Sequence, residues 1–164
     1  MVVFVVERYG ERYDTIYPYI DRGGIWFSIL SSDIRRYGSN YQILHNFSGN
    51  WLYGKVDVKR PFFIDVGYND EDFYPLIMYH MLGQEPDYDI RQLLEDMRYR
   101  CGEQDDDFHS ECLEEEFAKK EKISSDILKR RGYDGVVFMR VSDEKEDLLQ
   151  LFYVGNPKDV KWYS

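Results

Sequence analysis

The stretch ILKRRGYDGVVFM, residues 127–139, decides how the C-terminal part of this chain folds. A helical pattern stops at Gly132, a residue type that readily takes the left-handed conformation that closes a helix. A Tyr-Asp-Gly turn signal follows, and an apolar, β-branched run begins at once. A second apolar run, residues 148–154, comes after a polar loop. The pattern therefore predicts a helix, a turn and a β-hairpin.

Upstream of this stretch, short β-branched and aromatic runs alternate with turn signals, which is typical of strands. Residues 51–58 alternate especially well between apolar and polar side chains. Together with the hairpin, these runs predict strands at residues 2–6, 25–28, 41–47, 51–58, 62–66, 136–139 and 148–154.

The middle of the chain has helical periodicity. Phe73, Ile77 and Met81 recur at a spacing of four, and a second one-sided apolar stripe falls within residues 88–99. Ser124-Ser125-Asp126 reads as an N-cap that starts the last helix. We expect helices at residues 31–37, 70–82, 88–99, 109–122 and 126–131.

The order of strands, then helices, then strands predicts an α+β fold rather than alternating βαβ units. A length of 164 residues, of which 43% are hydrophobic, suits one domain with a substantial core. We therefore expect residues 1–164 to form a single domain that carries a helical insertion at about residues 70–131. Acidic residues concentrate within that insertion, at residues 103–121.

The net charge of −10 argues against nonspecific binding to nucleic acid, which depends on neutralising phosphates. It permits a basic partner or mimicry of nucleic acid. The two cysteines are too few for a disulfide framework, and with His109 their spacing matches no usual zinc pattern, so we expect no metal site. No signal peptide and no membrane-spanning run are visible, which favours a soluble cytosolic protein.

Four stretches, taken in order, resemble one family. They are GGIWFS at residues 23–28 with a Tyr-Gly ten residues on, the strand and KRPFFID at residues 53–65, GYDGVV at residues 132–137, and FYVGNPKDVK at residues 152–161. This order is similar to that of ADP-ribosyltransferase-like domains of phage, prophage and polyvalent mobile-element proteins. The resemblance runs from about residue 20 to the end of the chain.

The resemblance implies split mixed and antiparallel β-sheets that grip NAD in a cleft. The implied reaction transfers ADP-ribose from NAD, as a substrate, to a protein or nucleic-acid group and releases nicotinamide. Such a site needs a residue that holds the nicotinamide ribose, an aromatic ring on the nicotinamide, and a carboxylate. The carboxylate orients a hydroxyl and stabilises an oxocarbenium-like transition state.

Carried over position by position, the family's Ser/Thr falls on Ser28 and its nicotinamide-stacking Tyr falls on Tyr37. The backbone of Gly24 and of its neighbour Gly23 would approach the ligand, although a plain turn explains the two glycines equally well. The first strand usually brings a His or Arg, and Arg8 is the nearest match.

The family's catalytic Glu falls on Leu151 or, one residue earlier, on Gln150, and neither is acidic. An amide can hydrogen-bond a ribose hydroxyl but carries no negative charge. The missing carboxylate would then come from the hairpin loop at residues 144–147, through a shift of register, or from Asp134 in the turn. The resemblance therefore assigns Gln150 and Ser28 to catalysis, and Arg8, Gly24, Ser28 and Tyr37 to NAD binding.

Three functions follow from these patterns. The first is an ADP-ribosyltransferase of phage or mobile-element origin that modifies a host protein, for instance a defence component, in the host cytosol. The second is a catalytically degenerate form of the same fold that inhibits a host complex by binding, with residues 103–121 as the contact surface. The third is an acidic nucleic-acid mimic, which interspersed lysines and arginines disfavour. None requires a membrane or direct binding to nucleic acid.

Overall fold

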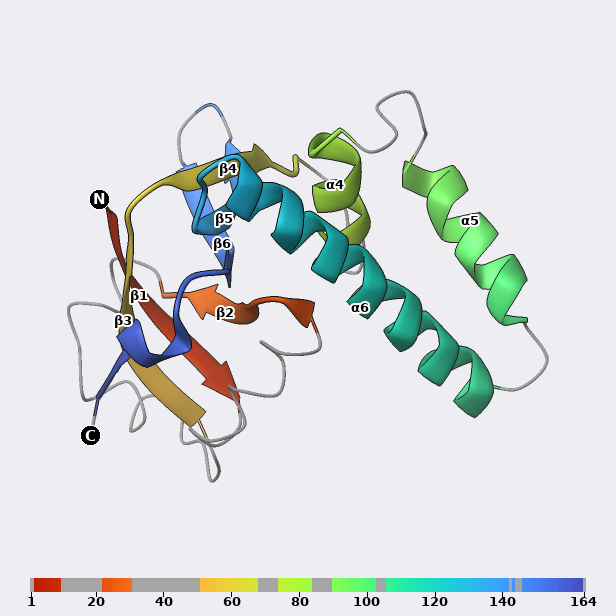
Figure 1. Cartoon of the computed structure of the whole chain (residues 1–164), viewed down its shortest axis with the longest axis horizontal. Coiled ribbons are helices and arrows are strands. Elements are labelled where there is room, and N and C mark those ends of the chain that lie inside the picture. Colours follow the sequence, from red (N-terminus) through yellow and green to blue (C-terminus); the bar gives the residue numbers. More distant parts are fainter. Residues whose placement is uncertain are drawn as a thin grey trace.

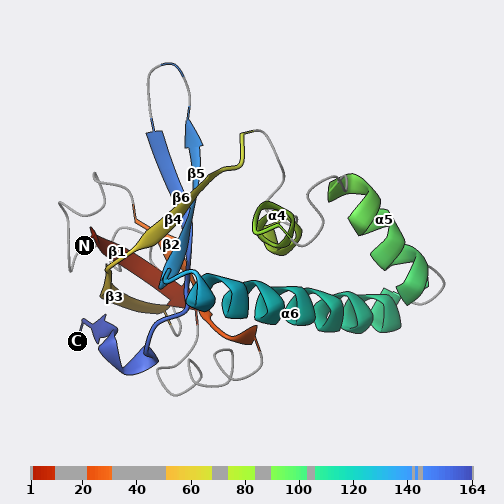
Figure 2. The ribbon, with the colours of Figure 1, turned by 45° about the horizontal axis from the view of Figure 1, so that its top comes forward.

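The computed structural model describes residues 2–9, 22–30, 51–67, 74–83, 90–102, 106–141, 143 and 146–163. Within them the chain has the expected α+β class, with one mixed sheet and helices on one side of it (Figures 1 and 2). The elements are β1 (Val2–Tyr9), β2 (Ile25–Ile29), β3 (Trp51–Val58), β4 (Pro61–Asp65), α4 (Tyr74–Met81), α5 (Ile90–Cys101), α6 (Asp106–Arg130), β5 (Gly135–Val141), β6 (Glu146–Tyr153), the 3-10 turn η4 (Pro157–Asp159) and β7 (Lys161–Trp162).

The sheet has seven strands in the order β4-β5-β6-β2-β1-β3-β7. Only β4 and β5 are parallel, and every other neighbouring pair is antiparallel. Among the strand pairings in the middle of the sheet, the one between β1 and β2 contains the fewest residue pairs. At this junction only Val6 and Glu7 of β1 pair, with Ile29 and Ser28 of β2. By contrast, β1 pairs with β3 along its whole length. The sheet is therefore nearly divided between β1 and β2.

The sheet curls strongly, as the connection between β3 and β4 shows. These strands lie near opposite ends of the strand order, yet only Lys59 and Arg60 separate them in sequence (Figure 1). A Cβ placed on Gly135 of β5 would lie 3.2 Å from a methyl of Val58 in β3. The two halves of the sheet thus pack against each other at this corner.

Two hydrophobic cores lie on the two faces of the β5–β6–β2 part of the sheet. On one face, Phe138 and Phe152 pack against α4 and the end of α6, together with Trp26 of β2. On the other face, Phe27 and Leu151 pack against β1 and β3. Alternate residues of these strands therefore enter different cores, which fixes their register.

The helices account for one correction to the sequence analysis. Helix α6 runs unbroken for 25 residues, so the expected N-cap at Ser124-Ser125-Asp126 is wrong. The hydroxyl of Ser124 instead donates to the Lys120 carbonyl oxygen, and that of Ser125 donates to the Gly23 carbonyl oxygen at 2.6 Å. Because both hydroxyls have other acceptors, neither one interrupts the helix.

Helix α4 also differs from its predicted pattern. The described part of α4 covers Tyr74–Met81, and Met81 is 53% exposed although the spacing of four placed it on the buried stripe. Ile77 and Met78 face the sheet, whereas Leu76 and Tyr79 belong to a separate cluster with α5. Helix α4 is therefore buried on two sides, by the sheet and by α5, and Met81 lies outside both sets of contacts.

Helix α5 lies farthest from the sheet (Figure 2) and is joined to α6 by a disulfide between Cys101 and Cys112. The buried stripe predicted for this helix is confirmed at Leu93, Leu94 and Met97. Of the other predicted elements, the strands within residues 51–66 and the C-terminal hairpin are confirmed. The helix expected at residues 31–37, with Tyr37, and the strand expected at residues 41–47 lie outside the described residues.

Candidate functional site

Residues from four neighbouring strands, β6, β2, β1 and β3, form a polar row across the middle of the sheet. Ser28 of β2 pairs with Glu7 of β1 on one side and with Gln150 of β6 on the other. Val6 and Ile29, the adjacent pair of β1 and β2, both enter the core between the sheet halves. Since side chains alternate along a strand, Glu7 and Ser28 point away from that core, on the same side as each other.

The structure distinguishes between the two positions on which the family's Glu falls. Leu151 is completely buried in the core between the sheet halves, and it pairs with Phe27. Gln150 is half-buried and pairs with Ser28. Of the two, only Gln150 shares the face of Ser28, so it is the position at which a polar side chain can join the row.

The remaining neighbour of Glu7 in the row is Tyr53 of β3. Tyr53 is 8% exposed, and its pKa is raised above the ordinary value, first by burial and then by the negative charge of Glu7. Glu7 itself is half-buried. The carboxylate and the phenol therefore interact electrostatically in surroundings from which much of the water is excluded.

Arg8, the residue predicted to contact NAD from the first strand, lies beside the row. Its Nη1 donates a hydrogen bond of 2.9 Å to the carbonyl oxygen of Trp26 in β2. This bond crosses the junction between β1 and β2 where the strand pairing is short. Arg8 thus braces the two strands that carry Glu7 and Ser28, and its contact with NAD remains a prediction.

Gly23 and Gly24 lie at the start of β2 and are both buried. A Cβ on Gly24 would lie 2.7 Å from the ring of Phe152 and 2.8 Å from the carbonyl oxygen of Tyr153, and one on Gly23 would collide with Ser125. Close packing against β6 and α6 therefore explains both glycines. A role for Gly24 toward NAD would have to act through its backbone.

A buried ion pair anchors the start of β2 to α6. Glu121 is 1% exposed, and both of its oxygens accept hydrogen bonds from Nη1 of Arg22, at 3.0 and 3.1 Å. Burial raises the pKa of Glu121, although Arg22 and a hydrogen bond from Trp26 act in the opposite direction. Arg22 also pairs with Glu114. The strand that carries Ser28 is thereby fixed to the helix.

The Tyr-Asp-Gly turn is a structural corner. Gly132 has a φ of +83°, and the Tyr133 amide donates to the Leu128 carbonyl oxygen, as in a Schellman motif. The two carboxylate oxygens of Asp134 each accept a hydrogen bond of 2.8 Å, from the backbone amides of Lys59 and Arg60. Asp134 therefore holds the β3–β4 corner and is not placed to serve the polar row.

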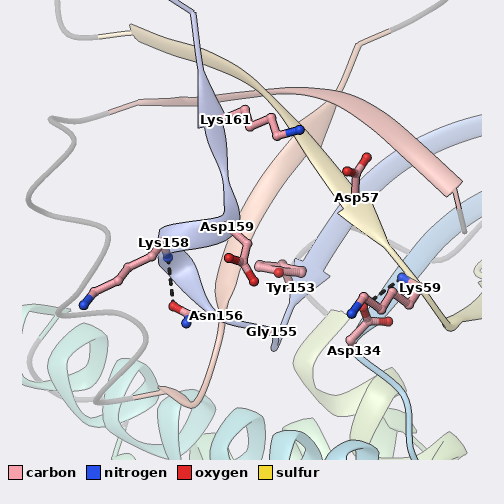
Figure 3. Close-up of a pocket in the computed structure, with 9 residues that line it drawn as sticks. All are labelled: Asp57, Lys59, Asp134, Tyr153, Gly155, Asn156, Lys158, Asp159 and Lys161. Carbon is pink, nitrogen blue, oxygen red and sulfur yellow. Dashed lines mark hydrogen bonds between the residues drawn. The ribbon is translucent and has the colours of Figure 1, made fainter.

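A pocket of about 560 Å³ opens near this corner (Figure 3). Lys161 extends toward Asp57 within it, whereas Lys158 extends away from the other side chains. Tyr153 pairs with Ile25 at the opposite end of β2 from Ser28, so this pocket and the polar row are separate places. The lining residues are of mixed charge: Asp57, Lys59, Asp134, Tyr153, Gly155, Asn156, Lys158, Asp159 and Lys161.

Sequence reasoning missed Glu7 as a site residue because it looked for a cation on the first strand. The relevant signal is the alternation of Phe4 and Val6 into the core between the sheet halves, which leaves Glu7 on the opposite face of β1. Glu146 and Asp147, expected as substitutes, are exposed at the start of β6 and pair with Val141 and Arg140. No register shift brings them opposite Ser28.

No model of a protein family, no curated protein and no solved structure matches this chain. Among the described residues, no three His, Cys, Asp or Glu side chains are grouped so as to hold a metal ion, and Cys101 and Cys112 are joined to each other. The described helices are also too short or too polar to cross a membrane.

Proposed function

We propose that this protein is an ADP-ribosyltransferase-like protein that binds NAD beside the polar row and transfers ADP-ribose to another protein. The resemblance in sequence supports this proposal, and one observation carries it. Ser28 and Gln150, which the resemblance connects to a single site, stand directly opposite each other on β2 and β6.

The residues of the row suit the ribose part of NAD. A hydroxyl, an amide and a carboxylate on one face offer donors and acceptors for ribose hydroxyls and for the nicotinamide carboxamide. Among the described residues, Ser28 and Gln150 form no side-chain hydrogen bond with one another or with other groups. Ser28 and Gln150 would hold the ribose, and Arg8 would hold the segment that carries them.

In the proposed reaction, the bond between ribose C1′ and the nicotinamide nitrogen breaks, and its electron pair leaves with nicotinamide. An oxygen or nitrogen of the acceptor protein forms the new bond to C1′ and gives up its proton. The protein contributes by orienting the ribose and by placing negative charge near it.

The finer fold assignment belongs to this proposal. The resemblance implies two small sheets, and the two-residue junction between β1 and β2 is compatible with such a division. Helices α4, α5 and α6 correspond to the expected insertion. We further propose a phage or mobile-element origin, action in the host cytosol and a host protein as acceptor.

A second function, inhibition of a host protein by binding alone, is favoured by the neutral side chain at Gln150. The contact surface would be the acidic part of α6. Within it, Glu114 pairs with Arg22 and Glu116 pairs with Arg100, whereas Glu111 and Glu115 are exposed. Charge reversal at Glu111 and Glu115 therefore tests this surface without breaking internal ion pairs.

The proposed function is tested by calorimetry with NAD and by incubation of a host lysate with a labelled NAD analogue. We expect saturable NAD binding, weakened at least tenfold by Ser28→Ala, and a labelled acceptor band. Ser124→Ala is the matched control, because its hydroxyl bonds within α6 and should leave NAD affinity unchanged. Absence of both binding and label would reject the transferase. A partner captured equally well without NAD, and lost on charge reversal, would support the inhibitor.

A further inference from the structure

We propose that Glu7 supplies the negative charge that the site lacks at Gln150, so that the catalytic carboxylate has moved from β6 to β1. This inference rests on the proposed function and names the residue that makes it chemically workable. The carboxylate and the amide flank Ser28 from opposite sides of the same row.

Glu7 and Gln150 hold equivalent positions on the two sides of Ser28. Directly opposed residues of antiparallel strands have Cβ atoms about 4.5–5.5 Å apart on the same face of the sheet. Ser28 stands in this relation to Glu7 and equally to Gln150. A group held by the Ser28 hydroxyl is therefore within reach of a side chain from either neighbouring strand.

The surroundings of Glu7 strengthen the effect of its charge. Glu7 is half-buried, and its charge is strong enough at Tyr53 to contribute to the raised pKa of that phenol. A carboxylate that acts on a neighbour through partly dry surroundings also acts more strongly on positive charge that develops on a substrate than one in bulk water would.

The other acids considered lie away from Ser28. Asp134 is at the β3–β4 corner, and Glu121 is on α6. Asp147 lies three residues before Gln150, about 10 Å away along β6 at the usual strand rise. Of these carboxylates and Glu7, only Glu7 is directly opposite Ser28.

The chemical role follows from the charge balance. When the C1′–nicotinamide bond breaks, the electron pair leaves with nicotinamide, and positive charge develops on the ribose. The anionic Glu7 stabilises this charge until the acceptor's oxygen or nitrogen forms the new bond and releases its proton to solvent. Gln150 contributes hydrogen bonds to the ribose but no charge.

The experiment compares nicotinamide release and NAD affinity in the wild type, in Glu7→Gln, and in Glu7→Gln combined with Gln150→Glu. We expect Glu7→Gln to lower kcat roughly 100-fold while NAD affinity changes by less than about threefold. The double variant returns the carboxylate to the other side of Ser28 and has the net charge of the wild type. Its kcat should be at least tenfold higher than that of Glu7→Gln.

Glu146→Gln is the control for loss of one carboxylate, because this exposed residue lies at the far end of β6. Thermal melting of each variant separates loss of catalysis from loss of folding, and rescue by the double variant is an effect that a purely structural Glu7 would not produce. An active wild type with an equally active Glu7→Gln variant would overturn the role of Glu7 and leave the transferase standing. A wild type that neither binds NAD nor releases nicotinamide would overturn both.

Discussion

The β3–β4 corner and the polar row both contain polar residues singled out from the sequence, yet their polar groups are used in opposite ways. At the corner, each oxygen of Asp134 accepts a hydrogen bond from a backbone amide. In the row, the strand ladders satisfy the backbone, and Ser28 and Gln150 project from paired strands. The difference teaches that polar residues singled out from the sequence can hold backbone segments together at one place and project from paired strands at another.

The largest effect on stability should come from the corner. Asp134→Ala leaves two amides without their acceptor, and each hydrogen bond to a carboxylate contributes about 1.5 kcal/mol. We therefore expect the free energy of unfolding, measured with urea, to fall by roughly 3 kcal/mol. Ser28→Ala should cost less than about 0.5 kcal/mol, as is usual away from buried networks. Equal costs at Asp134 and Ser28 would remove the distinction between corner and row.

A smaller loss is expected just before β2, where Gly24 precedes the strand that carries Ser28 and is packed closely against β6. Gly24→Ala places a methyl group against Phe152 and the Tyr153 backbone, and overpacking of this kind costs about 2 kcal/mol. Gly67→Ala is the comparison, because Gly67 has a φ of +56° and open space around it. That change should cost about 1 kcal/mol, from backbone strain alone. A tolerated Gly24→Ala would instead favour a backbone that is open to a ligand.

A still smaller effect should appear in the pH dependence of stability. Burial raises the folded-state pKa of Glu121 above its unfolded value of about 4.3. Between these two pKa values the folded chain holds a proton that the unfolded chain has lost, so stability falls as pH rises through this window. The side chain at position 121 cannot titrate in Glu121→Gln. The free energy of unfolding of this variant should therefore not show the fall with rising pH that Glu121 causes. Urea titrations from pH 4 to 7 on both proteins test this, and parallel curves would contradict the assignment.

The smallest effect tests the electrostatics of the row directly. Glu7→Gln removes the charge that helps to raise the pKa of Tyr53, so the pKa of this phenol should fall. It should stay above the ordinary value because burial, the larger cause, is unchanged. NMR titration of protein labelled with ¹³C at the tyrosine Cζ measures the shift. An unchanged Tyr53 pKa would show that the Glu7 carboxylate does not act on the Tyr53 phenol.

Much of the sheet could be predicted from local sequence. The alternation at residues 51–58 and the apolar runs of the hairpin gave the correct strands, and Gly132 marked the end of α6 correctly. The predicted cap at Ser124-Ser125-Asp126 failed because the acceptor of the Ser125 hydroxyl lies at Gly23, far away in sequence. A local pattern cannot distinguish a capping hydroxyl from one that bonds to a distant strand.

The candidate site could be predicted only in part, for a related reason. The resemblance pointed to Ser28 and to either Gln150 or Leu151, but the register of β2 against β6 was needed to select Gln150. The alternation of Phe4 and Val6 indicates the face on which Glu7 lies, but the pairing of β1 with β2 was needed to place Glu7 opposite Ser28. Register is a property of strands that meet across long stretches of chain.

The register shift between β5 and β6 has a consequence for how this protein can vary. Phe138 pairs with Gln150 and Met139 with Leu148, so one residue of β6, Leu149, is left over as a bulge. Between the bulge and the hairpin tip, the pairing of β5 with β6 is therefore shifted by one residue relative to the part of β6 that pairs with β2. An insertion or deletion at the hairpin tip can be absorbed there by moving the bulge along the strand, while Gln150 stays opposite Ser28. The tip can accordingly change length over evolutionary time without altering the row.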